Sequence, residues 1–296
     1  MLAFGLALAL ASAFATNLGF LLRHRGAVAA PDVDVRHPLR SAIDLFRSKW
    51  WTIGYLVAAV AYGLHVGALA LASLSLVQAV LAGGLALLGV IAERWFGFRL
   101  GKREWTGIGL AAVGLAFLAL TGGGESGQES SDYSMAAMIA WESTLVALGT
   151  TLILFHRSQR SPSRHGVLLG VAAGFLFTVT HVAVKALTGQ VGEGVAAIAP
   201  YALVGVPAAI VAFFASARSL QLGDAVAVIA VTSIASNASA IPAGVVVFSD
   251  PIGEDAVSVG FRSLAFILVV LAAAIIPGPT RATAPRGRTP APAGSG

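Results

Sequence analysis

The chain consists mainly of long apolar stretches separated by short polar gaps. We predict membrane-spanning helices at 2–22, 50–72, 75–96, 105–121, 136–155, 167–187, 195–217, 225–247 and 260–277. These stretches have the length that a helix needs to cross the hydrocarbon core, roughly 17 to 25 mostly apolar residues. The pattern therefore predicts an all-α integral membrane protein with nine transmembrane helices.

The charged residues in the gaps change sign from one gap to the next. Seventeen of the 19 Lys and Arg residues fall in every second gap or in the tail, and the alternate gaps carry acids instead. Short cytoplasmic loops are enriched in Lys and Arg, so this asymmetry predicts an N-terminus outside and a C-terminus inside. The two exceptions, Lys185 and Arg262, lie near the outer ends of their spans.

Composition narrows the class of protein further. Hydrophobic residues make up 57% of the chain and charged residues 11%, whereas a soluble domain has about 25% charged residues. The net charge of +5 is scattered over short loops, which favours anionic lipid over nucleic acid as the partner. No cysteine is present, so disulfides and thiolate chemistry are excluded. No basic region precedes the first apolar stretch, and we therefore expect a span there and not a cleaved signal peptide.

The linker between the first two spans, residues 23–49, has an amphipathic pattern of its own. Apolar side chains recur at helical spacing with basic side chains between them, namely Leu39, Ile43, Phe46 and Trp50 with Arg40, Arg47 and Lys49. Such a stripe predicts an interfacial helix on the inner leaflet. The tail, residues 278–296, is rich in Pro, Gly, Ala and Arg, and we expect it to be disordered.

An internal repeat divides the chain. Residues 73–80 (SLSLVQAV) recur as residues 219–226 (SLQLGDAV), with five of eight positions identical. By this register spans one to four match spans six to nine, and the fifth span inverts the second set. We predict a first repeat at 1–121, a linking segment at 122–166 with the extra central helix, and a second repeat at 167–277. Inverted repeats of 4+4 helices are typical of secondary transporters, although apolar segments can also match by chance.

The sequence resembles a known family at several motifs. Residues 75–80 (SLVQAV), Glu93-Arg94 and 102–107 (KREWTG), followed by the Ala/Gly/Leu-rich fourth span, are similar to the drug/metabolite transporter superfamily and its EamA-like members. Nine spans, an outside N-terminus and a long first inner linker are similar to its NIPA-like magnesium-transporter branch. Residues 184–187 (VKAL) are similar to the element that closes the sixth span in that branch. The resemblance implies a transporter fold and a small solute as cargo.

One departure from the magnesium-transporting relatives concerns the second span. Those relatives have a Gly-Glu pair and then an Asn, where this chain has Ala61-Tyr62 and then His65. Mg²⁺ prefers carboxylate and water oxygens, and imidazole is instead a good proton carrier. The departure weakens the magnesium interpretation.

Ionisable residues inside the spans are few, and they are costly enough to suggest function. Glu142 lies near the middle of span five, His65 in span two, and His181 and Lys185 in span six, where Thr178 shares their helical face. Glu142 paired with a histidine would make a proton-coupling site, and Glu142 paired with Lys185 would make a structural clamp. Snorkelling of Lys185 to the headgroups and structural hydrogen bonds of the histidines stay open as alternatives.

Span eight carries a polar face, with Ser233, Ser236 and Asn237 near the midplane among Thr232, Ser239 and Pro242. We interpret this face as the lining of a cavity, with hydrogen bonding between helices as the alternative. Gln78 and Asn17 are weaker candidates in the first repeat.

We therefore predict a multi-pass secondary transporter of the cell membrane that moves a small solute by alternating access around a cavity lined by spans two, three, six and eight. The alternatives are a NIPA-like magnesium or divalent cation transporter and a non-transporting scaffold or sensor. No enzyme motif appears, so we expect no catalytic residues and no cofactor. The metal ligands, the coupling ion and a homodimer stay open.

Overall fold

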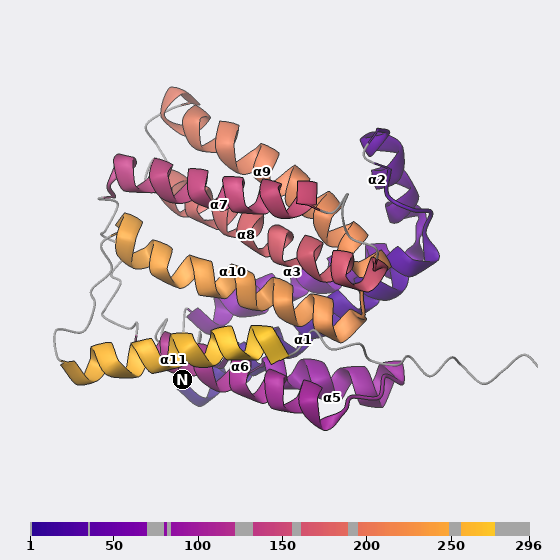
Figure 1. Cartoon of the computed structure of the whole chain (residues 1–296), viewed down its shortest axis with the longest axis horizontal. Coiled ribbons are helices and arrows are strands. Elements are labelled where there is room, and N and C mark those ends of the chain that lie inside the picture. The colour runs from indigo at the N-terminus through magenta and orange to yellow at the C-terminus, as the bar shows by residue number, and fades with distance from the viewer. Residues whose placement is uncertain are drawn as a thin grey trace, which may run out of the picture.

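The computed structural model describes residues 2–34, 36–69, 80–81, 84–121, 133–155, 161–188, 195–248 and 256–275, and these contain helices and no strand. The helices are α1 (Leu2–Ala29), α2 (Pro38–Arg47), α3 (Lys49–Leu69), α5 (Leu85–Phe96), α6 (Lys102–Thr121), α7 (Met135–Phe155), α8 (Pro162–Thr188), α9 (Val195–Leu222), α10 (Ala225–Phe248) and α11 (Ala256–Ile275). Figure 1 shows all but α2 running roughly side by side, with α2 across one end of the bundle.

The all-helical membrane class predicted from the sequence agrees with these helices. Within the described residues, α1, α7, α8, α9 and α10 are long and apolar enough to cross a membrane. The chain is thus a multi-pass membrane protein by the length and composition of its helices. The count of nine crossings and the assignment of inside and outside stay predictions.

The third predicted span differs most from the structure. The sequence predicts a span at 75–96, but the regular helix α5 begins at Leu85, and residues 70–79 and 82–83 lie outside the described residues. Gly84 directly precedes α5, and its N–H donates to Val80 O at 2.9 Å. A Cβ at Gly84 would lie 2.5 Å from the Ala13 Cβ, so the absence of a side chain lets α1 approach closely. The Gly84 carbonyl accepts a hydrogen bond from Asn17 Nδ2 at 2.9 Å.

Three pairs of helices and one central helix organise the bundle. Helix α1 packs along α3, α8 packs along α9 in the same way, and α6 packs along α11. Helix α10 contacts α1, α5, α6, α7, α8, α9 and α11. Because α10 has neighbours on most sides, changes in its packing affect both halves of the chain.

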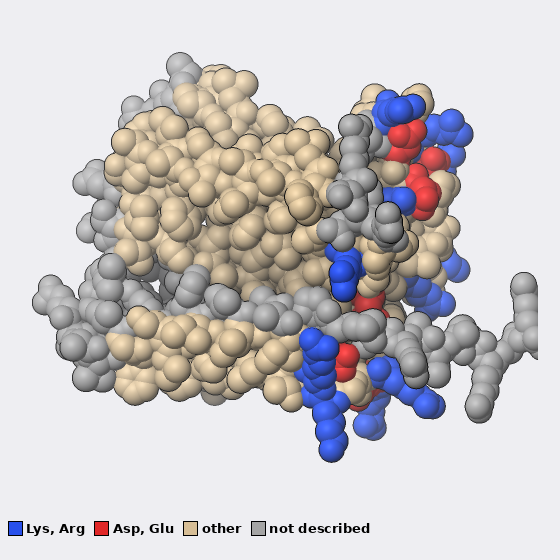
Figure 2. Space-filling model, in the orientation of Figure 1, with Lys and Arg blue, Asp and Glu red and all other residues tan. Residues whose placement is uncertain are grey.

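Charged side chains gather at one end of the bundle, which we call the charged end. Figure 2 shows Lys, Arg, Asp and Glu of the visible face collected there, whereas the rest of the described surface in this view carries other residues. Arg103 Nε at the start of α6 donates to Ile275 O at the end of α11 at 2.9 Å. At the opposite end, Ser134 N before α7 donates to Val247 O near the end of α10 at 3.1 Å. The start of α6 therefore lies beside the end of α11 at the charged end, and the start of α7 lies beside the end of α10 at the opposite end.

A buried apolar cluster that begins at the charged end joins the two predicted repeats and reaches Ile234 of α10 and Ala265 of α11. It joins residues of the first repeat, such as Leu21, Trp51 and Leu88, to residues of the second, such as Leu220 and Ile229. Among the described residues, two clusters farther along the bundle do not cross between the repeats: Ala9 with Ala68 lie in the first, and Val182 with Val247 lie in the second together with Met138 of the linking segment. The two halves are thus joined by this core at the charged end, and α6 and α11 also join them farther along, where the Phe117 and Phe261 rings stack at 6.3 Å between centroids.

Candidate functional site

The polar face of α10 that the sequence indicates as a cavity lining packs instead against α8. Thr178 Oγ1 donates to Ser236 O at 2.9 Å and lies 2.8 Å from Ser239 Oγ. A Cβ at Gly174 would lie 2.6 Å from Thr232 O, so the two helices touch through small residues. Thr178 and Ser239 are buried. Thr178 and Ser236 therefore bond between helices in this structure, which is the alternative that the sequence left open for this face.

The opposite face of α10 changes from buried to open along its length. Val226 and Ala230 are 1% and 0% exposed in the core at the charged end. Ser233 and Asn237 continue the same stripe at steps of three and four residues, and there Ser233 is half-buried and Asn237 exposed. Asn237 Nδ2 donates to Ser233 O of its own helix at 2.8 Å. The amide of Asn237 thus lies on a face that opens away from the charged end.

The contact between α3 and α9 changes in the same direction. Near the charged end the Phe213 ring lies 5.8 Å from the Trp51 ring and 6.1 Å from the Tyr55 ring, measured between centroids. Tyr62 follows Trp51 on the same side of α3, about 20° away at 3.6 residues per turn, and Val206 follows Phe213 on α9 in the same way. Tyr62 is 70% exposed and Val206 55%. The facing surfaces of α3 and α9 are therefore closed at the charged end and open farther along.

The ionisable residues of α8 and α3 lie around this open region with different surroundings. His181 is exposed on α8, the helix that packs against both α9 and α10. Lys185 Nζ lies 4.1 Å from the centroid of the Phe248 ring, a cation–π contact that holds the ammonium against the end of α10. His65 is half-buried, and its Nδ1 is buried without a hydrogen-bond partner.

Glu142 lies away from these residues, in the contact between α7 and α8. It is 5% exposed and shares its face of α7 with Met138, Leu145 and Gly149. On α8 the facing residues include Leu176, and His181 is about 140° away from Leu176 around the helix. Glu142 Oε1 has no hydrogen-bond partner, and no ion pair within the described residues involves it. Neither the pair with a histidine nor the clamp with Lys185 is formed.

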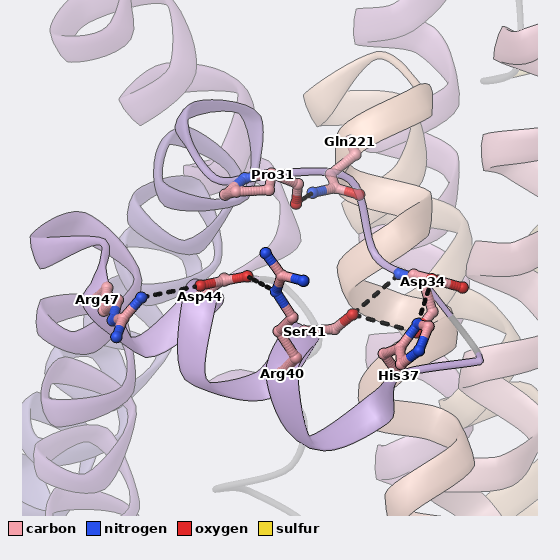
Figure 3. A network of polar contacts seen from close by, with 8 residues as sticks. All are labelled: Pro31, Asp34, His37, Arg40, Ser41, Asp44, Arg47 and Gln221. Carbon is pink, nitrogen blue, oxygen red and sulfur yellow. Dashed lines mark hydrogen bonds and ion pairs between the residues drawn. The ribbon is translucent and has the colours of Figure 1, made fainter.

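A polar network joins the two halves at the charged end, and we call it the Gln221 latch: Gln221, Arg218, Asp32 and the backbone of residues 27–33. Gln221 Nε2 donates to Ala27 O at 3.1 Å and to Pro31 O at 2.9 Å. Gln221 Oε1 accepts from Val33 N and from Arg218 Nη1, both at 3.1 Å. Arg218 also pairs with Asp32 at 2.7 Å. Figure 3 shows Gln221 of α9 beside Pro31 in the linker after α1.

The same linker fixes the start of α2. Ser41 Oγ accepts from Asp34 N at 2.9 Å and contacts Asp34 O at 3.1 Å, and His37 Nδ1 lies 2.9 Å from Asp34 Oδ2 (Figure 3). The hydrogen bond from His37 and that from the Arg36 backbone lower the pKa of Asp34 below its usual value. The linker is therefore tied to α9 on one side and to α2 on the other.

Some predicted features stay untested, and one important group was missed. Gln78, the first copy of the short repeat and the tail lie outside the described residues. The part of the chain that the structure describes has no group of three or more His, Cys, Asp or Glu side chains that could hold a metal ion. Sequence reasoning missed Gln221 and Arg218. The available signal was the position of Gln221 in the second repeat copy, at the end of a span and beside a basic residue.

The comparison with known proteins agrees with the motifs of the sequence. No protein-family model and no solved structure matches the chain. The chain is 27% identical over 250 residues to the probable magnesium transporter NIPA9 of Arabidopsis thaliana, an alignment that covers 80% of this chain and 71% of that protein. This relative confirms the resemblance to NIPA-like transporters that the motifs of the sequence indicate.

Proposed function

We propose that the chain is a secondary transporter that moves a small solute by alternating access, and that the structure holds its outward-open conformation. The observation that carries the proposal is the change along the bundle from a joined core to open faces. Trp51 and Phe213 are in contact at the charged end, and Tyr62 and Val206, on the same faces farther along, are exposed. A face between α3 and α9 that is in contact at one end and exposed at the other is what alternating access requires of either end state, while α6 and α11 stay packed along their lengths, with the Phe117 and Phe261 rings stacked at 6.3 Å between centroids.

Matching hydrogen bonds support the inverted repeat that such a mechanism uses. In the first half, Ser12 of α1 donates to Ala61 O of α3, and Asn17 of α1 donates to Gly84 O just before α5. In the second half, Thr180 of α8 donates to Gly205 O of α9 at 3.4 Å, and Thr178 of α8 donates to Ser236 O of α10. In each half the first helix is bonded to the second and the third. Each half is thereby suited to move as a unit.

The charge pattern supports the orientation of this proposal. With the charged end in the cytoplasm, the basic gaps face the side where short loops are enriched in Lys and Arg. The Gln221 latch then closes the cytoplasmic side, and the open faces meet the outer side of the cell membrane. The solute would contact Asn237, Ser233, Tyr62 and His181, which lie exposed or half-buried on these faces.

Glu142 is the residue we assign to coupling, at a distance from the solute. An ionisable side chain without a partner in an apolar helix contact is costly, and such residues mark proton pathways where water can reach them. Movement of α7 relative to α8 changes that access, so proton uptake at Glu142 and the position of α7 are linked. No direct bond to His65 or His181 is needed for this linkage.

A divalent cation such as Mg²⁺ is the second candidate cargo, and the relative named as a probable magnesium transporter favours it. Mg²⁺ keeps several of its waters when bound, so the neutral oxygens of Asn237, Ser233 and Tyr62 could take it in hydrated form. The lack of a carboxylate at Ala61-Tyr62 opposes tight binding of the bare ion.

Flux into proteoliposomes tests both the transport class and the cargo. Vesicles with a Mg²⁺ indicator inside are compared with and without a pH gradient, for the unmodified chain, Glu142→Gln and Thr144→Val. Thr144 lies on the same helix and its hydroxyl donates only to Ala140 O of that helix within the described contacts, so it is the matched control. We expect Glu142→Gln to abolish the effect of the pH gradient and Thr144→Val to leave it unchanged.

The outcomes separate the alternatives. Mg²⁺ uptake makes the divalent cation the cargo, and no Mg²⁺ uptake together with uptake of an organic solute from a panel supports the general carrier. If no solute moves and loss of the Asn237 amide changes nothing, the chain is a scaffold or sensor. An equal response to pH in Glu142→Gln removes this residue from the mechanism.

A further inference from the structure

Helix α2 is the element of the charged end that the transport proposal leaves without a role. It is an amphipathic helix of 10 residues, and Figure 1 shows it across the direction of the bundle. A helix in this position lies along the plane of a membrane whose normal is parallel to the bundle. Pro38 at its first position and the bonds between Ser41 and Asp34 fix its start. These contacts make α2 an ordered helix.

The buried and exposed sides of α2 are clearly divided. Leu45 is 0% exposed and Ser41 6%, so this side packs on the protein. The opposite side carries Leu39, Ile43 and Phe46, which are 80%, 54% and 47% exposed. Steps of four and three residues place these three on one stripe of the helix. A soluble surface would not present three large apolar side chains in a row.

The apolar stripe is continuous with the membrane-spanning body. The Phe46 ring lies 5.5 Å from the Tyr55 ring of α3 and 6.2 Å from the Phe213 ring of α9, between centroids. The stripe runs from there to Leu39 at the start of α2. Lipid that surrounds α3 and α9 would therefore reach Ile43 and Leu39 without crossing a polar barrier.

The charged side of α2 presents cations more than acids. Arg40 and Arg47 lie about 80 to 100° from the apolar stripe around the helix, and their side chains are 84% and 76% exposed. Asp44, which pairs with both at 3.9 and 3.4 Å, has a side chain only 20% exposed. One acid is thus shared by two guanidinium groups, and the outward surface is positive.

The neighbouring residues extend this positive border. The Arg25 guanidinium lies 4.1 Å and the Lys49 ammonium 5.6 Å from the centroid of the Trp50 ring at the start of α3. Tryptophan with basic neighbours is typical of the membrane–water interface. Guanidinium groups bind phosphate oxygens in a forked geometry, so the ligand that matches this border carries a phosphate.

We propose that α2 is a binding surface for anionic phospholipid of the leaflet at the charged end, with the headgroup phosphate between Arg40 and Arg47 and the acyl chains on Leu39 and Ile43. The juxtaposition of an exposed apolar stripe and an exposed basic border on a helix across the bundle carries the proposal. It does not rest on the identity of the cargo. The binding would hold the linker that carries the Gln221 latch.

Quenching by brominated lipid tests this surface in the full chain. The chain has no native cysteine, so Leu39→Cys carries a single environment-sensitive fluorophore. Vesicles contain phosphatidylglycerol and phosphatidylcholine, with bromine on the chains of one lipid and then of the other. The ratio of the two quenching efficiencies measures how far the anionic lipid is enriched around residue 39. We expect enrichment several-fold above the bulk composition.

Charge reversal on α2, compared with charge reversal elsewhere at the same end, tests whether the arginines of α2 cause the enrichment of anionic lipid. Arg40→Glu with Arg47→Glu should lower the enrichment roughly 25-fold at most, about fivefold for each basic residue lost near the surface, to the bulk ratio or below it. Arg99→Glu with Lys102→Glu, at exposed positions off α2, should leave it unchanged. Equal enrichment in both double variants, a bulk ratio in the unmodified chain, or no quenching by either lipid would each overturn the proposal. Native circular dichroism and gel filtration of the variants confirm that each is folded.

Discussion

Breaking the Gln221 latch should shift the protein away from the outward-open conformation. Gln221→Leu keeps the size of the side chain and removes four hydrogen bonds to Ala27, Pro31, Val33 and Arg218. Three of these join α9 to the linker of the first half, so they form in the conformation that the structure holds. The fourth lies within α9 and survives the opening of the halves.

The magnitude follows from the three bonds between the halves. A neutral hydrogen bond contributes about 0.5 to 1.5 kcal/mol net, and three contribute roughly 1.5 to 4.5 kcal/mol. Water reaches the exposed Pro31 and can replace part of these hydrogen bonds, and the variant keeps the ion pair between Arg218 and Asp32. We therefore take the stabilisation lost in Gln221→Leu as about 2 kcal/mol. That value lowers the ratio of outward-open to inward-open protein about 30-fold. A population about 90% outward-open would fall to about one quarter.

The rate of thiol labelling at the open end measures this shift. With Tyr62→Cys as reporter, we expect Gln221→Leu to slow reaction with a membrane-impermeant maleimide added from outside, in proportion to the outward-open population. Thr106→Val is the control, since its hydroxyl donates only to Lys102 O of its own helix within the described contacts at the same end. An unchanged labelling rate in Gln221→Leu, in protein that is folded and inserted, refutes the role of the latch.

Three further predictions concern packing and pH. Gly174→Ala places a Cβ 2.6 Å from a backbone oxygen of α10 and should lower the stability in detergent by at least about 2 kcal/mol. The control Gly109→Ala, whose Cβ would have nothing within 4 Å, should be neutral or gain up to about 1 kcal/mol. Equal melting temperatures of the two variants contradict the close contact between α8 and α10. Thr178→Val should cost about 1 to 2 kcal/mol and leave solute affinity unchanged in a binding assay, and a loss of affinity at full stability would restore the cavity interpretation. The hydrogen bonds lower the pKa of Asp34 in the folded protein, so the ionised Asp34 orders α2 above the ordinary carboxyl pKa, and this order is lost as the pH falls through the lowered pKa. Hydrogen exchange of α2 should therefore rise in that acidic range in the unmodified chain. An identical pH dependence in Asp34→Asn contradicts the assignment.

The direction of the helices and the polar faces could be predicted from the sequence because both depend on periodicity. Lys and Arg in alternate gaps predicted which helix ends lie together, and Arg103 at Ile275 O is an instance of it. Steps of three and four residues placed Thr178 on the same helical face as His181 and Lys185. Local sequence determines which residues share a face of a helix, so these faces can be predicted without knowing how the helices pack together.

What each face meets could not be predicted, since it depends on the rotation and docking of neighbouring helices. The stripe of Thr232, Ser236 and Ser239 has the same spacing whether it lines a cavity or packs against another helix. In the structure it packs against α8, where Gly174 allows the close approach. Glu142 was expected to meet a histidine, but α7 docks on the side of α8 that carries Leu176, away from His181. Gln221 acts on a linker about 190 residues away, and no local pattern announces such a contact.

The most direct test of the outward-open transporter compares two cysteines on one helix. Tyr62 and Val60 are 70% and 61% exposed, but they lie about 200° apart around α3, so Tyr62 faces the opening beside α9 and Val60 faces lipid. In right-side-out vesicles we predict that Tyr62→Cys reacts with an impermeant maleimide added outside and that Val60→Cys, kept from water by lipid, does not. Equal reaction of the two cysteines, or reaction of Tyr62→Cys only from the cytoplasmic side, would contradict the account.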